Sequence, residues 1–138
     1  MVDPVKRDAL INLIRSQPEH ESGRALVTVA EFFNGNADLG SIGCNLPDHP
    51  GLDHFRHVIT EIENHAGVEE VWMQIYDLDE GDWPFSENVL IVGRVPILEI
   101  RQLSESLEPS EISEMQLDWT PSRAKHLMGR SYINLWWD

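Results

Sequence analysis

Four side chains between residues 49 and 57 are of the types that bind metal ions: His49, Asp53, His54 and His57. Asp53 and His57 are four residues apart, so they share a face if they lie on a helix, and His49 can fold back from the preceding loop. Imidazole and carboxylate ligands suit zinc or a similar divalent ion. No His-Glu-x-x-His motif accompanies them, and solvated histidines on a helix surface explain the same spacing.

Cys44 is the sole cysteine of the chain and follows the glycine-rich segment 39–43. A thiol on such a loop near a helix N-terminus can have a lowered pKa and act as a nucleophile. A lone cysteine is also commonly a small, inert, partly buried residue. The glycines lack the Gly-Lys-Ser/Thr ending of a phosphate loop, and the sequence predicts no cofactor. Together with the nearby histidines, Cys44 defines one alternative function, a small metal- or thiol-dependent enzyme.

An acidic hairpin tip at the end of the segment 70–77 contains Asp77, Asp79, Glu80, Asp82 and Glu87. Oxygen-rich loops bind calcium, and Asp77-x-Asp79 begins like an EF-hand loop. Glycine then stands at the fifth position, where an oxygen ligand is needed, and an acid stands at the sixth, where glycine is needed. A solvated hairpin turn therefore explains the segment better than a calcium site.

Aromatic side chains lie close to these carboxylates in the sequence. Trp72 and Tyr76 are predicted to share the outer face of one strand, Trp83 follows the acidic turn, and Trp136 lies on the last strand. Tryptophan and tyrosine anchor interfaces, and their rings attract Arg and Lys. A second small core under the first helix is the alternative explanation. The predicted binding surface comprises Trp72, Tyr76, Asp77, Asp79, Glu80, Asp82, Trp83 and Trp136.

The net charge of −14 is concentrated in the middle of the chain, where residues 25–93 hold thirteen acidic residues against Arg56 alone. We expect this half to present a nearly unopposed negative surface. Such a field repels nucleic acid and anionic membranes, because both are bound through Lys and Arg. It attracts a basic protein and raises its association rate. Solubility alone also accounts for a high net charge.

The apolar periodicity predicts one α+β domain over residues 1–138. A first helix begins at Asp3-Pro4, and two more are expected near residues 52–62 and 96–107. Strands are expected at 25–33, 70–77, 88–92 and 131–138, with a long loop at 34–51 and a turn near Ser110. The order β-α-β-β-α-β after the first helix predicts a ferredoxin-like antiparallel sheet. Its second face is bare unless the first helix or the segment 118–129 covers it.

Three segments resemble those of a known group of proteins: Val-Trp-Met-Gln-Ile-Tyr-Asp-Leu at 71–78, Trp-Pro-Phe-Ser at 83–86, and Trp-Trp-Asp at 136–138. The chain resembles, over about residues 25–138, small acidic uncharacterised bacterial proteins that end in a similar Trp-Trp-Asp strand. The resemblance implies a bacterial origin and brings no established activity. By size and charge alone, the chain is also similar to immunity proteins that neutralise basic toxins.

The sequence therefore favours a non-enzymatic, inhibitor- or immunity-like binding protein that engages a basic protein partner through its acidic 61–87 region and the nearby rings. A structural subunit that buries the bare sheet face in a homodimer is a further alternative. The first residues lack the unbroken apolar core of a secretory signal, and no stretch reaches membrane-spanning length. With a single cysteine, these features predict a cytoplasmic protein.

Overall fold

The computed structural model describes residues 1–78 and 82–138. Within them, the helices are α1 (Pro4–Arg15), α2 (Val29–Phe33), α3 (Leu52–Glu63) and α4 (Ile97–Ser104). The strands are β1 (Ala25–Thr28), β2 (Val68–Asp77), β3 (Phe85–Gly93), β4 (Glu111–Gln116) and β5 (Ser131–Trp136). The fold is thus α+β, as the sequence predicts. None of the described helices is long and apolar enough to span a membrane.

All strands belong to one antiparallel sheet with the order β1-β2-β3-β5-β4. A ferredoxin-like sheet is built from split βαβ units, in which the strands joined by a helix run parallel with another strand between them. Here the helical connection joins β1 and β2, which are direct antiparallel neighbours with Thr28 opposite Trp72. The strand order therefore does not confirm the ferredoxin-like topology.

A capping box at Thr28 explains why the strand expected at 25–33 ends early. The Thr28 hydroxyl accepts a hydrogen bond from the Glu31 backbone N–H at 3.1 Å, and the Glu31 carboxylate accepts one from the Thr28 N–H at 2.8 Å. This reciprocal pair is typical of a helix start, and α2 begins at Val29. The chain turns back at this point, and β2 then begins at the end of the sheet where β1 stops.

The strand β4 was not predicted from the sequence, where the region around Ser110 suggests only a turn. Its six residues pair with β5 and place Glu111 opposite Trp136. No apolar alternation marks the strand, because Glu-Ile-Ser-Glu-Met-Gln lies at the edge of the described sheet with four of its residues exposed. Pairing with β5, rather than burial, defines it.

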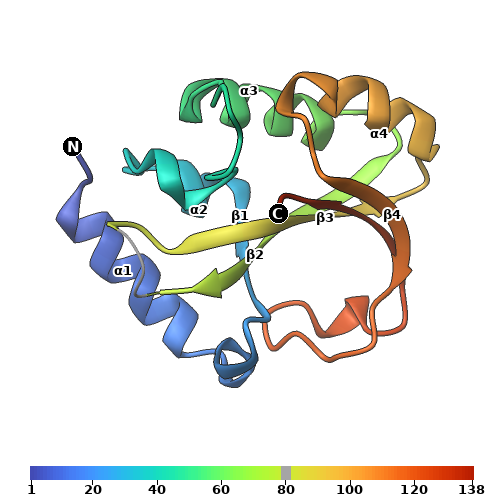
Figure 1. Cartoon of the computed structure of the whole chain (residues 1–138). Helices are drawn as coiled ribbons and strands as arrows, with labels where there is room; N and C mark the ends of the chain where they lie inside the picture. The colour runs from blue at the N-terminus through green and yellow to red at the C-terminus, as the bar shows by residue number, and fades with distance from the viewer. Residues whose placement is uncertain (79–81) are drawn as a thin grey trace.

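One face of the sheet carries the main core and is covered by helices. Figure 1 shows α2, α3 and α4 on one side of the strands, with α1 packed beside β1 and β2. Val71, Met73 and Ile75 of β2 point into this core, as predicted from their alternation. Phe55 and Ile59 of α3 are fully buried against it.

The opposite face is covered along part of its area by residues 117–130, here called the covering segment. Its Leu117, Ala124 and Leu127 form a second apolar cluster with sheet residues that include Leu90 and Tyr132. In Figure 1 the segment lies on the side of the sheet away from α3 and α4. The expectation that residues 118–129 can cover this face is confirmed.

Candidate functional site

The covering segment is held to the sheet by ion pairs with residues from the acidic middle of the chain. Arg123 donates to both carboxylate oxygens of Glu31, at 2.7 and 3.2 Å. Two further pairs join Arg130 to Glu69 at 2.7 Å and His126 to Glu70 at 2.9 Å. The prediction of a nearly unopposed negative surface over residues 25–93 is therefore wrong at Glu31 and Glu69, because Arg123 and Arg130 from the C-terminal quarter fold against them.

The carboxylate of Glu31 stabilises this attachment in its ionised form. Burial by itself raises the pKa of Glu31, but the hydrogen bonds and the charge of Arg123, with the capping bonds from Thr28, outweigh it. The pKa consequently lies below its ordinary value of 4.5. Glu19 has a lowered pKa as well, because the hydrogen bonds from Ser122 outweigh its burial.

Replacing Glu31 by Gln is expected to lower the free energy of unfolding by about 1 kcal/mol at neutral pH. Glutamine also serves at this position of a capping box, so the change mainly removes the charge facing Arg123. Since the folded-state pKa of Glu31 lies below the ordinary value of 4.5, its stabilisation is complete above pH 4.5 and is lost as the pH falls through the lower folded-state pKa. Urea denaturation of both proteins across this range measures the effect.

A matched control for this prediction is Glu61→Gln on α3. Glu61 pairs with His57 at 2.9 Å, but both side chains are more than half exposed. Exposed pairs contribute little, so we expect a smaller loss than for Glu31→Gln. Equal losses in the two variants, or a Glu31→Gln loss that persists in acid, would contradict the assigned role of the Arg123 pair.

The structure separates the four rings of the predicted binding surface. Trp83 is 1% exposed and belongs to the main core, so it is not a surface ring. Trp72 is partly covered by the covering segment, with the Arg123 guanidinium 5.6 Å from its ring centroid and its indole N–H donating to Glu70. The ring of Tyr76 remains exposed, and that of Trp136 is partly exposed.

Tyr76 and Trp136 lie on the part of the second sheet face beyond the covering segment's apolar cluster. This part, here called the polar half-face, consists of Gln74, Tyr76, Asn88, Asn134 and Trp136. Alternation along β2 and β5 puts these side chains on one side, and the Asn88 amide donates to the Asn134 amide oxygen at 3.0 Å. The rings of Phe85 and Tyr76 pack in a T-shaped arrangement with their centroids 6.1 Å apart.

Carboxylates surround Trp136 on this half-face. Glu111 is its direct cross-strand neighbour on β4, so both side chains point to the same side. Glu87 accepts a hydrogen bond from the Trp136 side chain. Burial raises the pKa of Glu87, and the negative charge of Asp138 raises it further, against the lowering effect of that hydrogen bond. The raised pKa of Glu87 thus reflects mainly its burial.

The acidic turn contributes less to the site than the sequence suggests. Asp77 ends β2 opposite Phe85, and Asp82 is exposed, with its backbone carbonyl accepting a hydrogen bond from Arg7 of α1 at 2.7 Å. Asp79 and Glu80 lie outside the described residues. Of the predicted residues of the turn, Asp77 follows Tyr76 at the end of β2 and Asp82 lies beside α1, whereas the tip formed by Asp79 and Glu80 stays a prediction.

The histidines of the metal hypothesis have separate partners. The ring nitrogens of His49 bind the Ile42 carbonyl at 2.8 Å and the Gly51 N–H at 2.9 Å. His54 contacts Ser106, and His57 contacts Glu61. Among residues 1–78 and 82–138, no group of three or more His, Cys, Asp or Glu side chains is placed to hold a metal ion. Cys44 is exposed.

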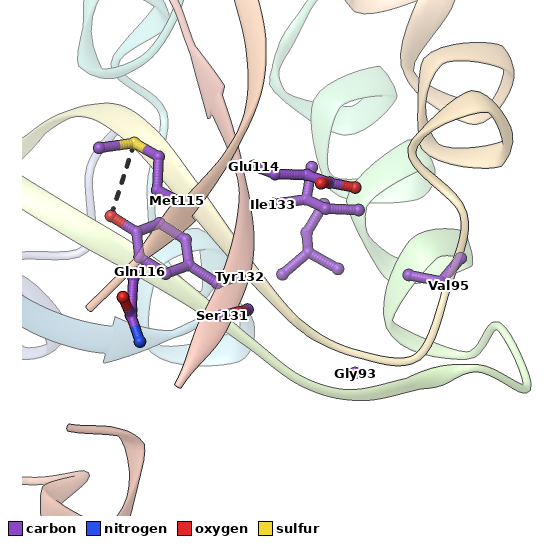
Figure 2. Close-up of a pocket in the computed structure, with 9 residues that line it drawn as sticks. Gly93, Val95, Glu114, Met115, Gln116, Ser131, Tyr132 and Ile133 are labelled. Atoms are coloured by element: carbon purple, nitrogen blue, oxygen red, sulfur yellow. Dashed lines mark hydrogen bonds between the residues drawn. The ribbon is translucent and has the colours of Figure 1, made fainter. Parts of the chain in front are cut away.

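An open pocket of about 380 Å³ lies at one end of β3, β4 and β5. Figure 2 shows Glu114 and Ile133 on the side of the strands that faces Val95, whereas Met115 and Tyr132 lie on the other side. Ile91 and Ile133 belong to the main core, and Glu114 contributes a carboxylate. No pattern in the sequence indicates this pocket, because its residues come from three strands and the loop after β3, and the β4 strand was not predicted.

Comparison with known proteins gives a family match along most of the chain. A family model described as the uncharacterised protein YfbO family matches residues 5–132. The curated Escherichia coli (strain K12) protein named "Uncharacterized protein YfbO" is 27% identical over 131 residues, which cover 94% of each chain. No solved structure matches the chain. These matches agree with the expected resemblance to uncharacterised bacterial proteins, whereas the matched range ends before Trp136 and leaves the terminal Trp-Trp-Asp motif a prediction.

Proposed function

The chain belongs to the uncharacterised YfbO protein family, which assigns no activity, and from the site itself we propose a non-enzymatic binding protein for a basic protein partner. The polar half-face is the proposed contact surface. Inhibition of that partner, as by an immunity protein, is the sharper form of the proposal. The cytoplasmic location expected from the sequence is part of it.

The observation that carries the proposal is the partly exposed Trp136 ring among the carboxylates of Glu87, Glu111 and Asp138. An aromatic ring gives a cationic side chain a face to stack on, and nearby carboxylates stabilise its charge. Tyr76 and Phe85 extend the aromatic surface on the other side of β3.

The alternatives have less support. Metal or thiol catalysis requires Cys44 and the histidines at 49–57 to act together, and each of these histidines is engaged with a different partner. A homodimer through the second sheet face would bury the polar half-face, with the carboxylates around Trp136, against the same surface of a second copy. Like charges brought together in this way disfavour association.

Replacing Trp136 by Ala is expected to weaken binding of a basic segment by about 2 kcal/mol, roughly 30-fold. The probe is a fluorescein-labelled peptide of alternating lysine and threonine, and fluorescence anisotropy at several salt concentrations gives its affinity. We expect binding that weakens as salt increases, because exposed charges are screened. The same peptide with glutamate in place of lysine should not bind.

Leu98→Ala is the control for loss of an exposed apolar side chain away from the site, since Leu98 is 68% exposed on α4. Its affinity should equal that of the wild type. If the wild-type protein does not bind the lysine peptide at low salt, or if Trp136→Ala binds it unchanged, the proposed contact surface is wrong.

A further inference from the structure

The strand β4 lies at the edge of the described sheet and pairs with β5 alone among the described strands. The backbone N–H of Leu117, just after β4, donates to the Arg130 carbonyl at 2.9 Å. This bond shows which residues of β4 direct their backbone N–H and C=O groups toward β5. By alternation, the backbone groups of Ser113 and Met115 face β5, and those of Ile112 and Glu114 face outward. Arg101 of α4 reaches the outward Ile112 carbonyl, at the long distance of 3.4 Å. This long contact protects the edge only in part, and such an edge is a template for another strand, which would displace Arg101 from the Ile112 carbonyl.

The open pocket lies directly beside this edge. Ile91, Val95 and Ile133 supply apolar lining, and the carboxylate-bearing Glu114 comes from β4 itself (Figure 2). A lysine or arginine side chain matches this combination, because its methylene stem packs on apolar surface while its charged head stays with carboxylates and water. On the other side of β4, Glu111 and Trp136 offer a second acidic and aromatic position.

The charge of the residues in and around β4 indicates which kind of partner this edge binds. No lysine or arginine occurs between Arg101 and Arg123, whereas the intervening residues include Glu105, Glu108, Glu111, Glu114 and Asp118. A second copy of the chain would bring its own β4 glutamates against these. A basic extended segment meets opposite charge on both sides of the strand, so complementarity favours it over self-pairing.

The geometry points to β-strand addition at β4 as the way in which this protein holds its basic partner. An extended segment of the partner pairs with the outward backbone groups of Ile112 and Glu114, and one lysine or arginine side chain enters the pocket toward the Glu114 carboxylate. Alternate side chains of the added strand then face Glu111 and Trp136. This inference rests on the proposed function, and it adds the backbone edge and the pocket to the polar half-face.

The test uses Glu114→Pro and Glu114→Gln with the same lysine–threonine peptide. Proline removes the outward N–H of residue 114 and leaves the bonds of Ser113 and Met115 to β5, and edge strands tolerate proline. We expect Glu114→Pro to weaken binding about tenfold or more. Glu114→Gln keeps the N–H and should weaken binding about threefold. Circular dichroism and thermal melting report whether each variant is folded.

A change in the ligand provides a readout that does not depend on the folding of any variant. Methyl groups on alternate backbone nitrogens of the peptide remove its pairing edge and leave its charge intact. The methylated peptide should bind the wild-type protein at least about tenfold more weakly than its parent.

The outcomes separate the two proposals. If Trp136→Ala weakens binding while peptide methylation and Glu114→Pro do not, strand addition is wrong and the proposed function stands. If no lysine peptide binds, both fail. Self-association that sedimentation detects in the wild type and not in Glu114→Pro would assign the edge to a second copy and overturn the inference.

Discussion

Replacing Trp83 by Ala is expected to lower the free energy of unfolding by about 3–5 kcal/mol. Trp83 is 1% exposed and packs in the main core, where loss of the indole leaves a large cavity. The stability of an ordinary domain is about 5–15 kcal/mol, so this one change removes a large fraction of it. Urea denaturation followed by circular dichroism measures the loss.

Trp83→Phe is the matched variant. The Trp83 indole nitrogen is buried and has no hydrogen-bond partner in the described part of the protein, so phenylalanine removes an unsatisfied donor while it keeps most of the apolar volume. We expect a loss of about 1–2 kcal/mol. At the same time, Trp83→Phe should bind the lysine peptide like the wild type. A stability loss near zero for Trp83→Ala, or impaired binding in a folded Trp83→Phe, would contradict the core role and show that Trp83 belongs to the binding surface.

Gly93→Ala is the second substitution with a large expected effect, a destabilisation of about 3–5 kcal/mol. Gly93 has a φ angle of 150°, which side chains rarely adopt. A Cβ atom at this position would lie 2.3 Å from the Gly67 carbonyl oxygen and 2.9 Å from the Glu69 backbone nitrogen. Both contacts are with backbone, so no rotamer change relieves them. Thermal and urea unfolding of the variant test the prediction.

Gly129→Ala separates the steric part of this effect from backbone strain. Gly129 also has a positive φ angle, of 80°, but a Cβ atom there meets nothing within 4 Å. We expect a loss of about 1–2 kcal/mol from strain alone. Losses of equal size at the two positions would mean that the close approach of Gly93 to Gly67 does not limit the fold.

The position of Trp83 illustrates how far the sequence defines the candidate site. Trp72 and Tyr76 share an outward face because side chains of a strand alternate, and that part of the prediction follows from local geometry. Trp83 lies just past a turn, where no periodicity indicates a direction, and proximity to carboxylates suggested exposure. Its place in the core depends on tertiary packing, because it joins an apolar cluster whose members come from distant parts of the sequence.

The charge distribution, too, can be predicted only in part from the sequence. Counting residues along the chain places the excess of acid correctly, but it gives no information on which carboxylates meet cations. Glu31 and Arg123 are 92 residues apart and form a bidentate pair. Glu87, by contrast, lies near Asp138, and its pKa is raised by burial and further by the charge of Asp138.

By itself, the sequence determined the α+β class, the positions of α1, α3, α4, β2 and β5, and the inward face of β2, because helix caps and apolar periodicity act over a few residues. It also contained the Thr28–Glu31 capping box that ends β1, although the β-forming composition of 25–33 concealed it. The tertiary structure alone decided the strand order, the edge strand β4 and the juxtaposition of Trp136 with Glu111. These depend on pairing between strands distant along the chain, and backbone hydrogen bonds that form such pairs are the same for every residue type except proline.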